Sequence, residues 1–181
     1  MRVITGTARG KKLETLNGEE IRPTTDRVKE AVFNILQFNI EGQNFLDLFA
    51  GSGQMGIEAL SRGAKKVVFI DSRRESINVV NKNLELVKLK NMANVFNIDA
   101  GSYLLKTNEV FDIVFLDPPY YSGEIHRIFP KLAKVVNKNG IIICENPIDE
   151  ILPEKLEEFI LSKVNKYGKI KISIYEKNGV E

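Results

Sequence analysis

The chain has 181 residues, 43% of them hydrophobic, which suits one domain with an apolar core and excludes a disordered chain. The net charge is only +2, so charge alone does not indicate a nucleic-acid-binding protein. The single cysteine, Cys144, excludes an internal disulfide and lies in an apolar run that predicts burial. The sequence has neither a signal segment nor an apolar run of membrane length, so we expect a cytoplasmic protein.

The first 43 residues are predicted to form an extension that precedes the main fold. Residues 1–20 read as a short β-hairpin with strands at 2–5 and 12–16. A helix is expected after Asp26, because apolar side chains recur there at a spacing that lines one helical face. They are Val28, Val32, Ile35 and Leu36.

Short apolar strands alternate with amphipathic helices from residue 44 onward. This alternation predicts a parallel sheet covered by helices on both faces, in which ligands bind outside the carboxyl ends of the strands. The residues that follow each strand are therefore the candidates for function. The expected strands span 44–48, 66–70, 94–98, 111–116 and 141–144, with helices at 56–61, 73–88, near Tyr103, at 125–136 and near 154–161, and two final strands within 164–175.

A glycine-rich loop follows the first of these strands. Gly51, Gly53 and Gly56 permit a tight turn and a close approach of a ligand to the backbone, a pattern shared with dinucleotide-binding loops. Asp47 lies before the loop, and its carboxylate repels a pyrophosphate but suits a ligand that carries an ammonium and a sulfonium. The loop therefore favours S-adenosylmethionine over a nicotinamide cofactor.

Two more carboxylates stand at strand ends. Asp71 follows the second strand, where an acidic side chain accepts both hydroxyl protons of a ribose; a helix cap ahead of Arg73 is the simpler alternative. Asp99 and Ala100 follow the third strand, where the carboxylate either accepts from an adenine amino group or caps the next helix. Together with the glycine loop, these residues predict an adenosine-binding site.

The most specific motif, Asp117-Pro118-Pro119-Tyr120, follows the fourth strand. The prolines remove two backbone donors and leave carbonyls, a carboxylate and an aromatic ring at the strand tip. This set suits an exocyclic amine of a base, whose lone pair is delocalised into the ring. Asp117 and the Pro118 carbonyl can each accept one N–H bond and aim the lone pair at a methyl donor, while Tyr120 stacks on the base. A rigid loop with an exposed tyrosine is the alternative.

Other chemistry finds no support in the sequence. His126 is the only histidine, and we expect it at the surface. No Cys/His cluster could hold zinc, and no Gly-x-x-x-x-Gly-Lys-Ser/Thr loop could bind a nucleoside triphosphate. We therefore expect no metal.

The whole chain resembles the RsmD family of bacterial methyltransferases, which act on guanine N2 in small-subunit ribosomal RNA. The segment most particular to that family is Arg22-Pro23-Thr24-Thr25-Asp26-Arg27-Val28. One departure is Gln54-Met55, where small or apolar residues are common; we expect those side chains to face away from the ligand. The other matching segments are 2–6 with Arg9-Gly10, 46–53, 60–64 and 115–120.

The resemblance implies a Rossmann-like class I fold, with a seven-stranded, mostly parallel sheet whose last strand is antiparallel. We expect a single domain, with residues 1–43 as the hairpin and helix extension and 44–181 as the catalytic core. Glu145, which ends the fifth strand, receives no role. The resemblance implies that the cofactor is bound by Gly51, Gly53, Asp71 and Asp99. It implies that the guanine is held by Asp117, Pro118 and Tyr120. It also implies that the segment with Arg22, Thr24 and Thr25 closes over the methionine end of the cofactor.

The sequence thus predicts methyl transfer from S-adenosylmethionine to a guanine amine in ribosomal RNA, either naked or within a small-subunit particle. The basic residues of the N-terminal hairpin are predicted to dock the RNA, with an ordinary solvated edge as the alternative. They are Arg2, Arg9, Lys11 and Lys12.

Two other functions compete with this prediction. A DNA adenine-N6 or cytosine-N4 methyltransferase uses the same Asp-Pro-Pro-Tyr chemistry, but residues 1–43 leave little room for a part that recognises a duplex site. A non-catalytic RNA-binding protein on a methyltransferase fold is disfavoured by the intact Asp117 and glycine loop.

Overall fold

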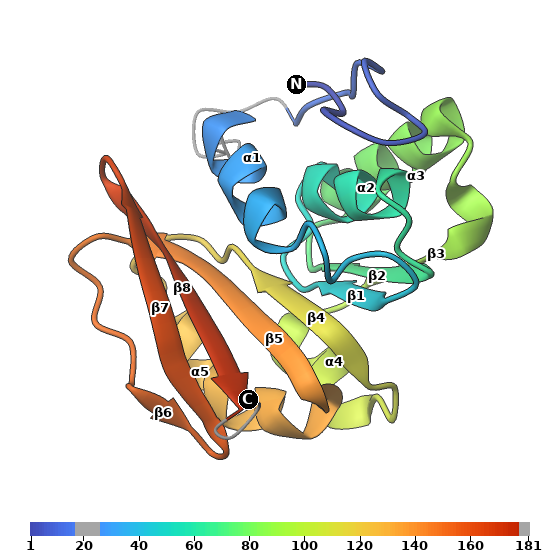
Figure 1. The fold of residues 1–181 in the computed structure, drawn as a ribbon. Coiled ribbons are helices and arrows are strands. Elements are labelled where there is room, and N and C mark those ends of the chain that lie inside the picture. Colours follow the sequence, from blue (N-terminus) through green and yellow to red (C-terminus); the bar gives the residue numbers. More distant parts are fainter. Residues whose placement is uncertain (17–25, 178–181) are drawn as a thin grey trace.

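The computed structural model describes residues 1–16 and 26–177. Across these residues the chain forms one eight-stranded sheet in the order β3-β2-β1-β4-β5-β8-β7-β6 (Figure 1). Strands β1 to β5 pair in parallel, whereas β8 runs antiparallel to both β5 and β7. The strands are β1 (Asn44–Asp47), β2 (Lys66–Asp71), β3 (Ala93–Asn97), β4 (Phe111–Leu116), β5 (Val136–Pro147), β6 (Lys155–Leu156), β7 (Phe159–Tyr167) and β8 (Ile170–Lys177).

Five α-helices in the described residues cover the sheet. Helices α1, α2 and α3 lie over one face, and α4 and α5 cover the other (Figure 1). The helices are α1 (Asp26–Ile35), α2 (Gln54–Ser61), α3 (Arg74–Val87), α4 (Ala100–Lys106) and α5 (Glu124–Leu132), with short 3₁₀ turns at Lys90–Met92 and Ala133–Val135. The predicted layering of a parallel sheet between helices is therefore confirmed.

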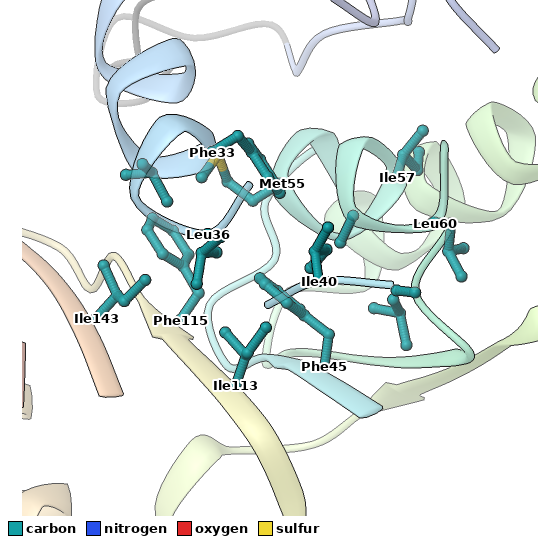
Figure 2. Close-up of a cluster of buried hydrophobic side chains, with 14 of the residues drawn as sticks. Phe33, Leu36, Ile40, Phe45, Met55, Ile57, Leu60, Ile113, Phe115 and Ile143 are labelled. Atoms are coloured by element: carbon teal, nitrogen blue, oxygen red, sulfur yellow. The ribbon is translucent and has the colours of Figure 1, made fainter. Parts of the chain in front are cut away.

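Alternation along the strands divides the apolar side chains between two cores. Phe45 of β1 points toward α1 and α2, and the next residue, Leu46, belongs to the core on the other face. Figure 2 shows Phe45 grouped with Phe115 of β4, Phe33 of α1 and Met55 of α2. Burying both faces fixes the register of the strands, and so fixes which residues emerge at their carboxyl ends.

The helix predicted near 154–161 is wrong. These residues form β6 and the start of β7, joined by a tight turn in which Glu157 has a φ of 51°. Leu156 and Phe159 are a cross-strand pair, and both are buried in the core shared with α5. Pairing with a strand buries these apolar residues as a helix would, and it extends the sheet. The two-residue β6 also raises the number of strands from the expected seven to eight, while the predicted antiparallel last strand is confirmed.

The predicted N-terminal hairpin is confirmed only in part: Arg2 and Lys12 form a β-bridge, and three backbone hydrogen bonds join Met1 and Val3 to Gly10, Lys11 and Leu13. Its backbone turns instead toward α2, where the Glu58 carboxylate accepts the N–H groups of Ile4 (2.8 Å) and Thr5 (3.0 Å). Donors that a second strand would use are thus satisfied by a helix side chain. The segment lies over the helices α2 and α3 rather than along a sheet edge (Figure 1).

Candidate active site

A cleft of about 750 Å³ opens at the carboxyl ends of β1, β2 and β4. It brings together all of the predicted cofactor and catalytic residues that the structure describes, except Gly53. Arg22, Thr24 and Thr25 lie outside the described residues. The predicted residues in the lining are Asp47, Gly51, Asp71, Asp99, Ala100, Asp117, Pro118, Pro119 and Tyr120.

Each glycine of the loop after β1 serves a different purpose. Gly51 and Gly53 adopt left-handed backbone angles, with φ of 54° and 80°. A Cβ atom on Gly51 would meet nothing within 4 Å, so the space beside it is open. A Cβ atom on Gly56 would lie 2.3 Å from the Phe69 ring, so this glycine lets α2 pack closely on β2. Gly53 caps α2 and does not line the cleft.

Asp47 places a buried carboxylate at the end of β1. Its Oδ2 accepts the backbone N–H of Gly56 at 3.0 Å. Burial raises the pKa of Asp47 to about 7, and the charge of nearby Asp71 adds to the rise, while the hydrogen bond from Gly56 opposes it. A positive charge placed beside this carboxylate would favour its charged form.

Asp71 accepts two backbone N–H groups and lines the cleft. Its Oδ1 accepts the N–H of Arg73 at 2.8 Å, ahead of α3, and its Oδ2 accepts the N–H of Gly51 at 2.9 Å. The side chain therefore supports both the start of α3 and the glycine loop. It also lines the cleft, and each carboxylate oxygen keeps acceptor capacity for a ribose hydroxyl.

Asp99 caps α4, because its Oδ1 accepts the N–H of Ser102 at 2.8 Å. The sequence did not reveal its other partner, Arg127 of α5, whose Nη2 lies 2.6 Å from Asp99 Oδ2 and 2.6 Å from Glu124 Oε2. The hydrogen bond from Arg127 is the main cause that holds the pKa of Asp99 below its usual value. The Arg127 guanidinium thus bridges Asp99 and Glu124, two carboxylates that line the cleft.

The Asp117-Pro118-Pro119-Tyr120 motif lines the cleft directly after β4. The Tyr120 hydroxyl donates to Oε1 of Glu145 at 2.9 Å, and its ring packs against the core beneath α1. Glu145 is buried near the end of β5. Sequence reasoning assigned Glu145 no role, since its partner lies 25 residues away in the chain.

The expectation that Gln54 and Met55 face away from the ligand is wrong. Both side chains are buried and line the cleft. The reason is that α2 begins at Gln54, so its first turn points into the space beside the glycine loop. The position of a helix start after a glycine loop is the signal that could have revealed them. Met1, Thr15 and Leu16 also reach the cleft from the N-terminal segment.

The remaining sequence predictions concern single residues and absent sites. Cys144 is buried and His126 is exposed, as expected. Within residues 1–16 and 26–177, no group of three or more His, Cys, Asp or Glu side chains could hold a metal ion. No helix of this described part is long and apolar enough to cross a membrane.

The strand order and the cleft at the strand ends are those of the Rossmann-like methyltransferases. The profile of the family described as Conserved hypothetical protein 95 matches residues 1–176. The chain belongs to this family, the RsmD family.

Similar proteins cover almost the full length of the chain. Ribosomal RNA small subunit methyltransferase D of Haemophilus influenzae is 38% identical over an alignment 181 positions long, which covers 97% of this chain and 93% of that protein. The protein of the same name in Escherichia coli is 34% identical, over 98% of this chain and 90% of its own length. The solved structure of the Escherichia coli yhhF protein superposes with a TM-score of 0.88 at 34% identity and covers 98% of this chain and 97% of its own.

Proposed function

We propose that the protein transfers a methyl group from S-adenosylmethionine to the exocyclic N2 amine of a guanine in small-subunit ribosomal RNA. The observation that carries this proposal is the cleft itself, in which a carboxylate-lined pocket beside a glycine loop meets the Asp117-Pro118-Pro119-Tyr120 motif. The names of the relatives, which are ribosomal RNA small subunit methyltransferases, support the choice of RNA.

The residues present fit the proposed cofactor. Asp47, buried and with a raised pKa, gains from the positive charge of the methionine end. Asp71 offers its remaining lone pairs to the ribose hydroxyls, and Asp99 with the Ala100 backbone offers contacts to the adenine. The open space beside Gly51 leaves room for the ligand next to the backbone. When bound, S-adenosylmethionine supplies an electrophilic methyl group on a sulfonium.

The other wall of the cleft positions the amine. Asp117 and the Pro118 carbonyl each accept one N–H bond of the amine, which draws the nitrogen toward tetrahedral geometry and directs its lone pair at the methyl group. Tyr120 stacks on the base, a contact worth roughly 1–3 kcal/mol in other proteins. Asp117 holds the amine proton and is the nearest acceptor when the proton leaves. Because the base must be unstacked, a loop in ribosomal RNA is the favoured target.

The N-terminal segment is proposed to contact RNA phosphates. The side chains of Arg2, Arg9, Lys11 and Lys12 are all exposed, and Met1 of the same segment lines the cleft. This places a row of cations on a segment that reaches the mouth of the site.

The test is methylation of defined substrates by the purified protein. We expect labelled S-adenosylmethionine to yield N2-methylguanosine in small-subunit ribosomal RNA or in the assembled particle, identified by mass spectrometry of nucleosides. Asp117→Ala serves as the control. Methylation of adenine N6 or cytosine N4 in duplex DNA instead would establish the main rival, and binding of RNA without any transfer would establish the non-catalytic one.

A further inference from the structure

Glu145 is a buried carboxylate that touches the proposed base-binding wall. Only 3% of its surface is exposed, and its Oε1 accepts the Tyr120 hydroxyl at 2.9 Å. Taking a carboxylate out of water costs stability unless it is used in a hydrogen bond or an ion pair. The proposed contacts to the cofactor and to the amine do not include Glu145, so they do not explain why a glutamate is buried here.

The strand register explains how this contact arises. Strands β4 and β5 pair in parallel with Leu116 opposite Cys144, so Asp117 follows β4 at the level of Glu145 in β5. The chain then turns after Pro119, and Tyr120 comes back over the end of β5. Asp117, which is proposed to hold the amine, thus follows β4, and Glu145, which binds the Tyr120 hydroxyl, lies in the neighbouring strand β5.

The Tyr120 ring is held both along its body and at its hydroxyl. Its body packs against the apolar core beneath α1, and its hydroxyl is bound by Glu145. A ring held only by its apolar body could still turn about its side-chain torsions, whereas a bond at its far end restricts them.

We propose that Glu145 is a positioning residue, which holds the Tyr120 ring as a rigid wall for the substrate base beside Asp117. This inference rests on the proposed function and deepens it. A stacking surface that is already ordered need not be ordered when the base arrives, so the amine is aligned with the methyl group more often. Glu145 itself touches neither the base nor the cofactor in this proposal.

The experiment compares Glu145→Ala, Glu145→Gln, Tyr120→Phe and the double variant Glu145→Ala/Tyr120→Phe. For each we would measure kcat and KM with RNA, the Kd for S-adenosylmethionine by calorimetry, and the Tm. Tyr175→Phe is the matched control, because it also removes a buried tyrosine hydroxyl, which donates to the Pro153 carbonyl at 2.7 Å in the other core.

We expect Glu145→Ala and Tyr120→Phe each to lower kcat by about 10- to 100-fold, the range in which small misplacements act. The cofactor Kd should stay within about two-fold, since neither residue is among the proposed cofactor contacts. The double variant should be no slower than the slower single variant, because both changes break one hydrogen bond. Glu145→Gln should recover most of the rate, because its amide oxygen can accept the same bond, and Tyr175→Phe should lose Tm but keep kcat.

Other outcomes would overturn the proposal. If the fold-loss of kcat in the double variant equals the product of the two single losses, Glu145 and Tyr120 act separately. An unchanged kcat in Glu145→Ala would mean that the ring needs no support, and a parallel loss of kcat and cofactor affinity would indicate a purely structural role.

A second measurement needs no substrate and does not depend on Glu145→Ala being folded. In 3-fluorotyrosine-labelled protein, which has five tyrosines, the ¹⁹F resonance that Tyr120→Phe removes should shift in Glu145→Gln, while the other four stay in place. An unmoved resonance would overturn the proposal. Offering ribosomal RNA, the assembled small-subunit particle and duplex DNA to the wild type distinguishes failure of the proposed function from failure of this inference. If none of the three is methylated, the proposed function fails, while the spectrum still tests whether Glu145 holds Tyr120.

Discussion

The backbone N–H of Gly56 donates a 3.0 Å hydrogen bond to Oδ2 of Asp47, which ties the first turn of α2 to the end of β1. This bond satisfies one of the donors that a helix leaves open at its N-terminus. It offsets only part of the cost of burying the carboxylate, because the pKa of Asp47 is still raised to about 7. Near neutral pH, Asp47 is therefore divided between its protonated and its charged form, and a bound cation would favour the charged form.

We predict that Asp47→Asn stabilises the free protein above pH 7 and weakens cofactor binding. The pKa of Asp47 is raised by folding to about 7, so its contribution to stability is present at low pH and is lost as pH rises through 7. The asparagine has no charge to bury and can still accept the Gly56 N–H. We expect a gain of about 1 kcal/mol or more at pH 8, which is about 2–4 °C in Tm for a chain of this size.

Thermal melts at pH 5 and pH 8 check this prediction. The difference in Tm between Asp47→Asn and the wild type should grow with pH, and the wild-type affinity for S-adenosylmethionine should rise between pH 6 and 8 while that of the variant stays flat. A variant that is less stable than the wild type at pH 8 would show that the charge of Asp47 is compensated in the free protein.

Asp117→Ala should abolish methyl transfer and leave the cofactor Kd within a few-fold. The reason is that Asp117 belongs to the motif after β4, whereas Asp47 and Asp71 end β1 and β2 and bind the backbone N–H groups of Gly56 and Gly51. Steady-state rates and calorimetric binding must be measured on the same preparation. An equal loss of rate and affinity would place Asp117 in the cofactor site instead.

Asp71→Ala should mainly weaken cofactor binding, by roughly 1.5–3 kcal/mol for the loss of charge-assisted bonds to a ribose. The structure adds a second effect, because Asp71 also accepts the N–H groups of Gly51 and Arg73. Asp71→Asn is the matched variant: its one amide oxygen can keep only one of those two bonds, so its affinity should fall between the wild type and the alanine variant. If both variants bind S-adenosylmethionine with the wild-type Kd, Asp71 only stabilises the glycine loop and does not contact the cofactor.

The sequence predicted the lining of the cleft well because the candidate residues stand at the end of an apolar strand or just after it. Asp47, Asp71 and Asp117 could be placed at one edge without knowledge of any tertiary contact, since parallel strands bring their carboxyl ends together. Contacts between distant segments carry no such local signal. The Tyr120–Glu145 and Asp99–Arg127 pairs are examples: their members lie 25 and 28 residues apart and belong to different elements.

The two errors in the fold have the same origin. Leu156, Phe159 and Ile160 are spaced as well for one face of a helix as for a short hairpin, and only pairing with the sheet decides between them. In the N-terminal segment, longer strands were predicted, but Glu58 and Ser61 of α2 accept the N–H groups of Ile4, Thr5 and Ala8. Neither residue looks unusual within a helix, so no local pattern indicated this role.

The last prediction concerns that N-terminal segment and its proposed contact with RNA. The triple variant Arg9→Ala/Lys11→Ala/Lys12→Ala should lower RNA affinity and flatten its salt dependence, by about 0.7 in log–log slope for each phosphate of a single strand that the variant no longer binds. Its Tm and cofactor Kd should not change, because the segment is anchored through its backbone and not through these exposed side chains. Those anchors are the bonds of Ile4 and Thr5 to Glu58, and of Ala8 to Ser61.

The control is a second triple variant, Lys106→Ala/Lys134→Ala/Lys138→Ala, which removes the same number of positive charges from exposed positions on α4 and after α5. This control should leave both the RNA affinity and the salt slope unchanged. Equal losses in the two variants would mean that RNA responds only to net charge, and a loss of Tm without any change in the salt slope would make the segment a structural cover for α2 and α3.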